Sequence, residues 1–354
     1  MKIALVTDTH FGARGDSAAF ADYFNRFYYD IFFPYLEKEG IEQIIHLGDI
    51  VDRRKYINFA TARHLKRFME RVTSSNMKID VIIGNHDTFY KNSNEMNSMK
   101  ELFENSLYNI RWHESARDVY FDDSDIPLGI CPWICSGNFN ETMDYLDNTK
   151  AQVLLGHLEI AGFEMYKGMT TNHGFEAKLF EKFDMVMSGH FHHRSSNGNI
   201  HYLGTPYEIT WSDWDDPRGF HILDTVTRQL TFIENPYKMF HKLHYDDSHG
   251  EQEKTIYSDP ESLRGCCVKV VVHSKTNPYW FDLFIDSLEK AGVQDLVVVD
   301  DHLNLNLDDD TELGEAEDTL TILRNYSASI ESRVDKKELD TFLVNLYQEA
   351  MTIE

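Results

Sequence analysis

Five short polar segments each follow an apolar run within the first 192 residues, and they constrain the fold more than any other feature. The segments are Asp8-Thr9-His10, Gly48-Asp49, Gly84-Asn85-His86-Asp87, Gly156-His157 and Gly189-His190-Phe191-His192. The runs before them are short and rich in β-branched or apolar residues, which is typical of buried strands. Ligands bind at the carboxyl edge of an open α/β sheet, so the pattern predicts one polar site at that edge.

Strands alternate with amphipathic helices through the first half of the chain. We expect strands at 2–7, 43–47, 79–83, 127–131, 152–155 and 185–188, and helices at 18–38, 60–73 and 99–104. This alternation predicts an α/β layered sheet. From about residue 200 the pattern changes to short strands separated by turns, at 200–203, 219–224 and 229–233. These strands are expected to form a second sheet layer that completes the same domain.

The rest of the chain is predicted to form three further parts. Pro236 follows a turn and marks the end of the first domain, which spans 1–236. Residues 237–306 are expected to form a small α+β domain, with strands at 266–273 and 293–300 around a helix at 280–291. Residues 307–318 read as an acidic linker, and 319–354 as a pair of helices, 320–330 and 336–351.

The last helix has an apolar face and no evident core of its own. The residues on this face follow helical spacing: Leu339, Phe342, Leu343, Leu346 and Tyr347. An apolar helix tethered by an acidic segment predicts a docking element for another chain.

Composition limits the class of protein. The 354 residues include 34 Lys and Arg against 59 Asp and Glu, a formal charge of −25. This charge argues against a polybasic nucleic-acid binder, although divalent ions can supply the positive charge that a phosphate needs. No apolar run reaches the roughly 18 residues of a membrane helix, and the N-terminal run ends at Asp8, too early for a signal peptide. The four cysteines, Cys131, Cys135, Cys266 and Cys267, match neither a zinc site nor a disulfide framework, and a cytoplasmic protein is expected.

The chemistry of the five segments indicates divalent metal ions. They offer oxygen or imidazole ligands and no thiolate, a set that suits Mn²⁺, Fe²⁺ or Zn²⁺. Two ions about 3.5–4 Å apart can hold a phosphodiester and activate water. In extended backbone, Asp8 and His10 are expected to point the same way, as are His190 and His192. Asp49 suits a bridging position, because a carboxylate has two oxygens and Gly48 leaves space beside it.

Each segment alone also has an ordinary structural explanation. Asp-x-His, Gly-Asp and Gly-His occur by chance in many chains, and histidines with satisfied hydrogen bonds occur in cores. Gly-Asn-His-Asp and Gly-His-x-His are more specific. All five segments in order, each at the end of a predicted strand, favour a metal site.

The order of these motifs resembles the calcineurin-like metallophosphoesterase superfamily. Within it, essentially the whole chain is similar to SbcD-type DNA double-strand-break repair nucleases, and most closely to the recombination nuclease subunits of T-even-like bacteriophages. The resemblance is carried by Gly48-Asp49-Ile50-Val51-Asp52, Ile83-Gly84-Asn85-His86-Asp87, Ser188-Gly189-His190-Phe191-His192, Gly204-Thr205-Pro206 and Asp216-Pro217-Arg218-Gly219-Phe220. It implies a four-layer αββα sandwich with a small α+β DNA-capping domain and a C-terminal helical tail.

The resemblance also implies roles for individual residues. One ion would be held by Asp8, His10, Asp49 and His192, and the second by Asp49, Asn85, His157 and His190. His86 would bind no metal and would lie over the scissile phosphate, where it stabilises or protonates the leaving group. Asp87 can orient His86 or cap the following turn, and a structural role is expected for it.

The function implied is a two-metal DNA exonuclease and endonuclease, with Mn²⁺ as the expected ion. It would work in a recombination and repair complex with an SMC-like coiled-coil ATPase of the SbcC type, held by the C-terminal helix face. A homodimer is expected, located in the host cytoplasm if the chain comes from a phage. Loop cations are candidate DNA contacts, although solvated surface charge explains each equally well: Arg53, Arg54, Lys55, Lys91 and Arg194.

Two other functions fit parts of the sequence. A phosphatase or small-molecule phosphodiesterase has a similar Gly48–Arg53 signature, but that class usually has Gly in place of Arg54 and Glu in place of Asp87. A scaffold with a vestigial site is disfavoured by the complete ligand set. Some cellular relatives have a second histidine where this chain has Asp52, so neither cleavage polarity nor the balance of exonuclease and endonuclease activity follows from the resemblance.

Two histidines outside the motifs are expected to be structural. His46 is predicted to pack within its strand, and His193 is predicted to be exposed.

Overall fold

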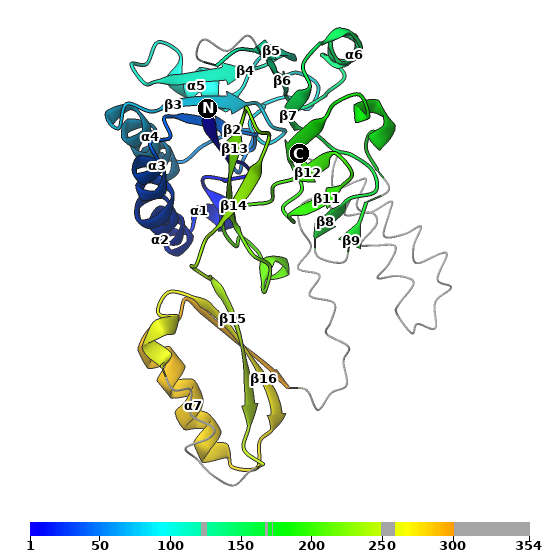
Figure 1. Cartoon of the computed structure of the whole chain (residues 1–354). Helices are drawn as coiled ribbons and strands as arrows, with labels where there is room; N and C mark the ends of the chain where they lie inside the picture. Colours follow the sequence, from blue (N-terminus) through cyan, green and yellow to red (C-terminus); the bar gives the residue numbers. More distant parts are fainter. Residues whose placement is uncertain (122–125, 167–168, 172, 249–258, 301–354) are drawn as a thin grey trace, which may run out of the picture. The chain divides into compact units, whose positions relative to one another are not determined.

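The computed structural model describes residues 1–121, 126–166, 169–171, 173–248 and 259–300 (Figure 1). Two six-stranded sheets form the centre of this described part. The first sheet contains, in spatial order, β14 (Leu230–Glu234), β13 (Gly219–Asp224), β1 (Lys2–Val6), β2 (Gln43–His46), β3 (Lys78–Ile82) and β4 (Ile110–His113). The second contains β11 (Ser195–Asn197), β12 (Ile200–Tyr202), β10 (Met185–Gly189), β7 (Val153–His157), β6 (Leu128–Cys131) and β5 (Arg117–Val119). A short hairpin follows β7, made of β8 (Glu164–Tyr166) and β9 (Met169–Thr170).

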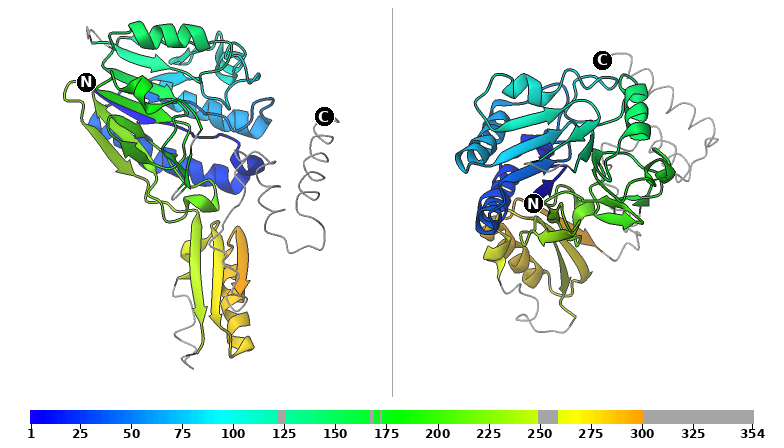
Figure 2. Two further views of the ribbon diagram at one scale, coloured as in Figure 1. Left: turned by 90° about the vertical axis from the view of Figure 1, so that its right-hand side faces the viewer. Right: turned by 45° about the horizontal axis from the view of Figure 1, so that its top comes forward.

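Helices cover the outer faces of both sheets. The helices on the first sheet are α2 (Ala18–Arg26), a π-helical segment (Phe27–Phe32), α3 (Phe33–Glu39) and α4 (Phe59–Ser74). The second sheet is covered by α6 (Phe139–Asn148), whose Leu146 packs on Leu154 and Val186. Figure 2 shows the two groups of helices on opposite sides of the paired sheets. Two short helices, α1 (Ala13–Asp16) and α5 (Ser98–Phe103), lie in the loops after β1 and β3.

Alternating side chains in the strands build the layers. In β1, Ile3 and Leu5 pack into the core between the sheets, whereas Ala4 and Val6 pack into the core under the helices. Because successive strand residues point to opposite faces, one strand serves both cores. The predicted four-layer αββα sandwich is therefore confirmed.

The assignment of strands to the two sheets differs from the sequence prediction. The second sheet begins at β5, and of the three late strands only β12 joins it. Strands β13 and β14 return to the first sheet, where β13 pairs antiparallel with β1. Residues of β13 alternate between the same two cores, Ile222 on the helix side and Leu223 between the sheets. Strand β13 therefore covers the open edge of β1, which its local sequence pattern does not indicate.

The expected single helix at 18–38 is divided into α2, the π-helical segment and α3. Pro34 lies in the first turn of α3, directly after the π-helical segment, and the backbone stays in the right-handed helical region at Phe32 and Phe33.

Residues after β14 form a three-stranded parallel sheet with its own core. Its strands are β15 (Phe240–Asp246), β16 (Cys267–Ser274) and β17 (Asp295–Asp300), and α7 (Pro278–Ala291) packs on one face. The sequence predicted β16, α7 and β17 but missed β15. The domain boundaries remain a prediction, and the acidic linker and the helix pair lie outside the described residues.

Two further sequence expectations can be compared with the described part of the chain. All four cysteines are buried and free, in agreement with the lack of a disulfide pattern in the sequence. Among the helices of the described ranges, none is long and apolar enough to cross a membrane.

Helix α4 offers a test of the layered core within one element. Phe68 is 1% exposed and contacts the rings of Tyr28 and Phe33, with centroids 4.9 and 5.3 Å away. Phe68→Ala should lower the free energy of unfolding by about 3–5 kcal/mol, because it removes buried surface and leaves a cavity. Phe59→Ala, at a side chain 95% exposed on the same helix, should change it by less than about 0.5 kcal/mol. Equal losses in urea titrations of the two variants would contradict this packing.

Candidate metal centre

The ends of five parallel strands bring the predicted ligands together. Strands β1, β2 and β3 run parallel in the first sheet, and β7 and β10 run parallel in the second. Their carboxyl ends therefore lie at one edge of each sheet. Two groups of ligand atoms result, each with its atoms within 4.8 Å of one another: Asp8, His10 and His192, and Asp49, His157 and His190.

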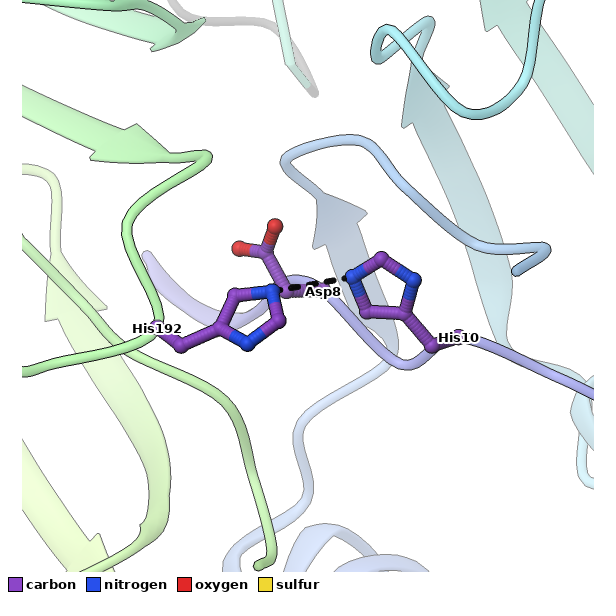
Figure 3. Close-up of side chains that lie close together, drawn as sticks. All are labelled: Asp8, His10 and His192. Atoms are coloured by element: carbon purple, nitrogen blue, oxygen red, sulfur yellow. Dashed lines mark hydrogen bonds between the residues drawn. The ribbon is translucent and has the colours of Figure 1, made fainter. Parts of the chain in front are cut away.

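The first group joins the loop after β1 to the loop after β10. The Nε2 atoms of His10 and His192 face each other at 3.1 Å, and the Asp8 carboxylate lies beside them (Figure 3). Asp8 accepts hydrogen bonds from Thr7 Oγ1 at 2.6 Å and from the backbone N–H of His190 at 3.1 Å. These bonds hold the carboxylate on the side of the imidazole nitrogens.

The second group adds an amide oxygen to its three members. Oδ1 of Asn85 lies 3.0 Å from Nε2 of His157 and 3.0 Å from Nδ1 of His190. Nδ1 of His157 lies 2.7 Å from the carbonyl of Leu47. A carbonyl oxygen only accepts hydrogen bonds, so Nδ1 carries the proton and the lone pair of Nε2 is left for a metal ion.

Asp49 lies between the two groups. Its Oδ2 is 3.3 Å from Nε2 of His157 and 4.0 Å from Nε2 of His10. Its Oδ1 accepts the backbone N–H of His86 at 2.7 Å. One carboxylate oxygen thus faces ligands of both groups, as the bridging prediction requires.

The backbone at these ligands is not extended, contrary to our expectation. Asp8, His10, Asp49 and His190 have φ values of 50°, 41°, 54° and 87°. Such left-handed conformations are costly for residues with a Cβ and persist where the surrounding structure enforces them. His190 and His192 belong to different groups, as the resemblance implies, and Asp8 and His10 share one.

Two glycines make room at the centre. A Cβ on Gly84 would lie 2.3 Å from Oδ1 of Asp49, so this glycine leaves the space that the Asp49 carboxylate occupies. A Cβ on Gly48, at φ +100°, would lie 2.4 Å from Nδ1 of His157. The space beside Asp49, which the sequence assigns to Gly48, therefore belongs to Gly84.

Asp87 supports the loop that carries Asp49. Its buried carboxylate accepts the backbone N–H groups of Asp49, Ile50 and Gly84 at 2.8, 2.9 and 2.9 Å. Burial and the nearby Asp49 raise the pKa of Asp87 to about 7. The expected structural role is confirmed, and it consists of holding this loop.

His86 is half-buried and has a defined orientation. Its Nδ1 lies 2.5 Å from the backbone carbonyl of Asp52. A carbonyl only accepts hydrogen bonds, so Nδ1 carries a proton. The rings of His86 and His10 meet edge to face with centroids 4.9 Å apart. The Asp52 carboxylate lies 3.5 Å from Nδ1 of His10. Asp52 therefore positions both histidines, one through its side chain and one through its backbone.

Carboxylates of the buried site stabilise positive charge at His10 and His157, whereas burial lowers the pKa of His190 to about 3. Burial disfavours the charged form of His10, but the carboxylates of Asp52, Asp49 and Asp8 outweigh burial and raise its pKa to about 9. Burial likewise opposes the charged form of His157, and Asp49 raises its pKa to about 9. These carboxylates thus stabilise cationic charge in the protein interior. The residues fit divalent ions, because oxygen and imidazole donors converge where the charge of a cation is favoured.

Arg218 is a supporting residue whose role the sequence did not reveal. It is buried, donates to the carbonyl of His192, and pairs with Asp213 and Asp216 at 2.9 and 2.7 Å. It also donates to Thr205 Oγ1 at 2.7 Å. These contacts fix the backbone that carries a candidate ligand. The segments around Thr205 and Arg218 carried the resemblance, but nothing in their local pattern indicates a contact with His192.

Trp133 is a second neighbour of the centre that sequence reasoning missed. Its ring centroid lies 5.2 Å from that of His190. It follows β6, a strand whose end was not among the five polar segments.

The candidate DNA contacts differ in their surroundings. Arg53 pairs with Asp16 at 2.9 Å, and Arg54 is half-buried and donates to Thr88 Oγ1 at 3.4 Å. The guanidinium of Arg194 lies 4.1 Å from the ring centroid of Phe232. Lys55 and Lys91 are exposed. Contact with DNA stays a prediction for all five.

The two remaining histidines have different outcomes. His46 is buried, with Nε2 2.9 Å from Thr9 Oγ1, as predicted. The prediction that His193 is exposed is wrong. It lies between Asp216 and Glu164, with ring nitrogens 2.8 and 3.4 Å from their carboxylates.

Comparison with known proteins agrees with this geometry. The calcineurin-like phosphoesterase family model matches residues 1–194. The chain is 33% identical over 318 residues to exonuclease subunit 1 of Enterobacteria phage T4, covering 89% of this chain and 90% of that protein. It is 26% identical over 284 residues to the SbcD component of the SbcCD nuclease of Staphylococcus epidermidis, covering 71% of each. The corresponding SbcD component from Staphylococcus saprophyticus is 24% identical over 307 residues, covering 77% of this chain and 79% of that one.

The family model spans more than half of the chain and includes every candidate ligand from Asp8 to His192. The chain belongs to the calcineurin-like phosphoesterase family.

Proposed function

We propose that this chain is a metal-dependent DNA nuclease that hydrolyses phosphodiester bonds as a subunit of a recombination and repair complex. The observation that carries the proposal is the pair of ligand groups on either side of Asp49, with His86 beside them. The names of the relatives, an exonuclease subunit and two components of SbcCD nucleases, support DNA as the substrate.

The candidate ligands divide into two sets that share Asp49. One ion, which we propose to be Mn²⁺, would be held by Asp8, His10, Asp49 and His192, and a second by Asp49, Asn85, His157 and His190. When bound, such a pair supplies an activated water and positive charge for the phosphate. Hydrogen bonds and contacts within the protein place and orient the candidate ligands. Leu47 sets the tautomer of His157, Asp52 orients His10, and Asp87 holds the loop of Asp49.

His86 is the proposed general acid. Its Nδ1–H donates to the fixed carbonyl of Asp52, which holds the ring in one orientation. Nε2 is then the atom that holds the proton for the leaving oxygen.

The assembly is part of the proposal. We propose an SMC-like coiled-coil ATPase as the partner, bound through the face of Leu339, Phe342, Leu343, Leu346 and Tyr347, and a homodimer of this chain. Residues 237–306 would cap the bound DNA, with the phosphoesterase domain at 1–236, the acidic linker at 307–318 and the helix pair at 319–354.

The first test examines both the preference for DNA as substrate and the role of Asp49 as a shared ligand. The full chain with Mn²⁺ should cleave single- or double-stranded DNA, alone or with the ATPase, in preference to phosphomonoesters. Asp49→Asn should abolish this cleavage, because both ligand sets lose the same negative charge. Gel assays with and without EDTA measure it, and circular dichroism confirms that the variant is folded. Hydrolysis of phosphomonoesters without DNA cleavage would refute the nuclease, and near-normal turnover of the variant would refute the bridge.

The second test separates proton transfer from metal binding. His86→Ala should lower turnover by about 10²–10⁴-fold, the usual contribution of general acid–base catalysis. Metal content, measured by mass spectrometry after dialysis, should stay at the wild-type level, since the backbone N–H that Asp49 accepts is retained. Loss of metal from the variant would make His86 a ligand instead.

The third test concerns the partner. A chain that ends at Asp318 lacks the helix pair and should lose stable association with the ATPase in co-purification. Its Mn²⁺-dependent cleavage of single-stranded DNA should persist, because the candidate ligands all lie before residue 193. Undiminished association of the truncated chain would place the docking surface elsewhere.

A further inference from the structure

The indole ring of Trp133 lies beside the second ligand group and is half-buried. Its centroid is 5.2 Å from that of the His190 ring and 6.3 Å from that of the His157 ring. In the described part of the chain, His190 also has the phenyl ring of Phe191 as a neighbour, with centroids 5.1 Å apart. Phe191 is only 2% exposed. Of these two rings, Trp133 is therefore the one whose surface a substrate can contact.

The ring of Trp133 is not part of the hydrophobic core. The nearby Cys131 and Ile134 are buried in the core between α6 and the second sheet. Among the described residues, Trp133 belongs to none of the apolar clusters and packs against none of them. Trp112, by contrast, packs on the core under the helices of the first sheet. A large ring that lies outside the core and beside a polar site is typical of a residue that binds a ligand.

The indole N–H of Trp133 is available to a ligand. Nε1 of Trp112 donates to the carboxylate of Glu114 at 3.1 Å. Nε1 of Trp133 makes no hydrogen bond to any residue within the described ranges. A tryptophan N–H usually has a partner in a folded protein. This donor is therefore left for water or for a polar atom of a substrate.

The backbone of Trp133 is fixed to the loop that carries a candidate ligand. Its N–H donates to the carbonyl of Ile83 at 2.8 Å. Its carbonyl accepts hydrogen bonds from Nδ2 of Asn94 and Nδ2 of Asn138, both at 2.9 Å. Ile83 lies two residues before Asn85. Three hydrogen bonds thus place the residue before a substrate arrives, which lowers the entropic cost of a contact with it.

We propose that the indole of Trp133 stacks on the base of a nucleotide next to the scissile phosphate, on the side of the second ligand group. The ligand groups bind a phosphate through charge, which is the same in every phosphodiester. Every base has an aromatic face, so stacking on the indole selects nucleotides without reading sequence. This inference rests on the proposed nuclease function and deepens it by naming the residue that recognises a nucleotide.

A purely supporting role for Trp133 is the main alternative, in which its ring only holds His190 in place. Other contacts already hold this histidine, since its Nδ1 lies 3.0 Å from Oδ1 of Asn85 and its backbone N–H donates to Asp8 at 3.1 Å. The two roles predict different dependence on substrate. Loss of support for His190 would slow hydrolysis of every phosphodiester, whereas loss of stacking would slow only hydrolysis of those that carry a base.

The test compares two nucleoside diesters with a diester that has no base. The full chain with Mn²⁺ is given thymidine 5′-(4-nitrophenyl phosphate), thymidine 3′-(4-nitrophenyl phosphate) or methyl 4-nitrophenyl phosphate, and released 4-nitrophenolate is measured by absorbance. The wild type should hydrolyse at least one thymidine ester with a kcat/KM at least about fivefold above that of the methyl ester, the low end of what one stacked base contributes. The ratio of the two kcat/KM values cancels any change that all the esters share.

Trp133→Leu should lower this ratio to about one, because leucine offers no ring to a base. Trp133→Phe should restore part of it, since a phenyl ring still stacks. Trp280→Leu is the matched control, because Trp280 is also half-buried but lies on α7, which packs on the three-stranded sheet. The control should keep the wild-type ratio. An equal loss of rate on all three esters in Trp133→Leu would assign the residue to the support of His190 and overturn the inference.

A binding measurement detects the stacked base without turnover. Tryptophan fluorescence is followed while thymidine 5′-monophosphate or thymidine 3′-monophosphate is added at constant Mn²⁺, with inorganic phosphate as the ligand that lacks a base. At least one nucleotide should quench the fluorescence of the wild type and of Trp280→Phe, and phosphate should not. Trp133→Phe should lose this quenching, because the stacked indole is gone. Quenching that persists in Trp133→Phe would place the base elsewhere.

The proposed function and this inference can fail separately. A wild type that cleaves no DNA would refute the nuclease, whatever its rates on the small esters. A wild type that cleaves DNA but prefers neither thymidine ester to the methyl ester would refute the inference alone. Retention of that preference by Trp133→Leu would refute it equally.

Discussion

The hydrogen bond between Nδ1 of His157 and the carbonyl of Leu47 joins the two sheets at the point where the site forms. His157 ends β7 in the second sheet, and Leu47 directly follows β2 in the first. The bond fixes the ring so that Nε2 faces Asp49 and Asn85. Gly48 makes this approach possible, because any Cβ at that position would overlap the imidazole. The remaining ligands are arranged around this contact, and the site exists only while the sheets stay paired.

Burying so many charged groups is costly, and the structure offsets the cost with specific hydrogen bonds. Asp87 illustrates this, since burial raises its pKa while four backbone N–H groups compensate its carboxylate. The left-handed backbone at Asp8, His10 and Asp49 adds strain that the surrounding packing must maintain. The aromatic core under α2, α3 and α4 supplies a rigid support on the far side of the first sheet. Stability in that core thus permits strain at the edge of the sheet.

Asp52 and Arg218 also position groups of the site, although the sequence motifs did not indicate these roles. Asp52 contacts His10 through its carboxylate and His86 through its carbonyl, so one residue aligns a proposed ligand with the proposed acid. Arg218 reaches the carbonyl of His192 from the loop that precedes β13. Neither contact follows from spacing in the chain, because each partner lies on a different strand end. Second-layer contacts of this kind orient ligands and tune their basicity.

The sequence by itself determined the strand ends, the chemical types of the ligands and the layered α/β class, because strand periodicity and short motifs are local properties. His157 and Asn85 are candidate ligands from the sequence because each follows an apolar run. Only the tertiary structure decided that β13 and β14 return to the first sheet, because antiparallel pairing with β1 depends on which edge is open. It also decided that the backbone at His190 is left-handed rather than extended, because the surrounding packing enforces a conformation that the local sequence does not indicate.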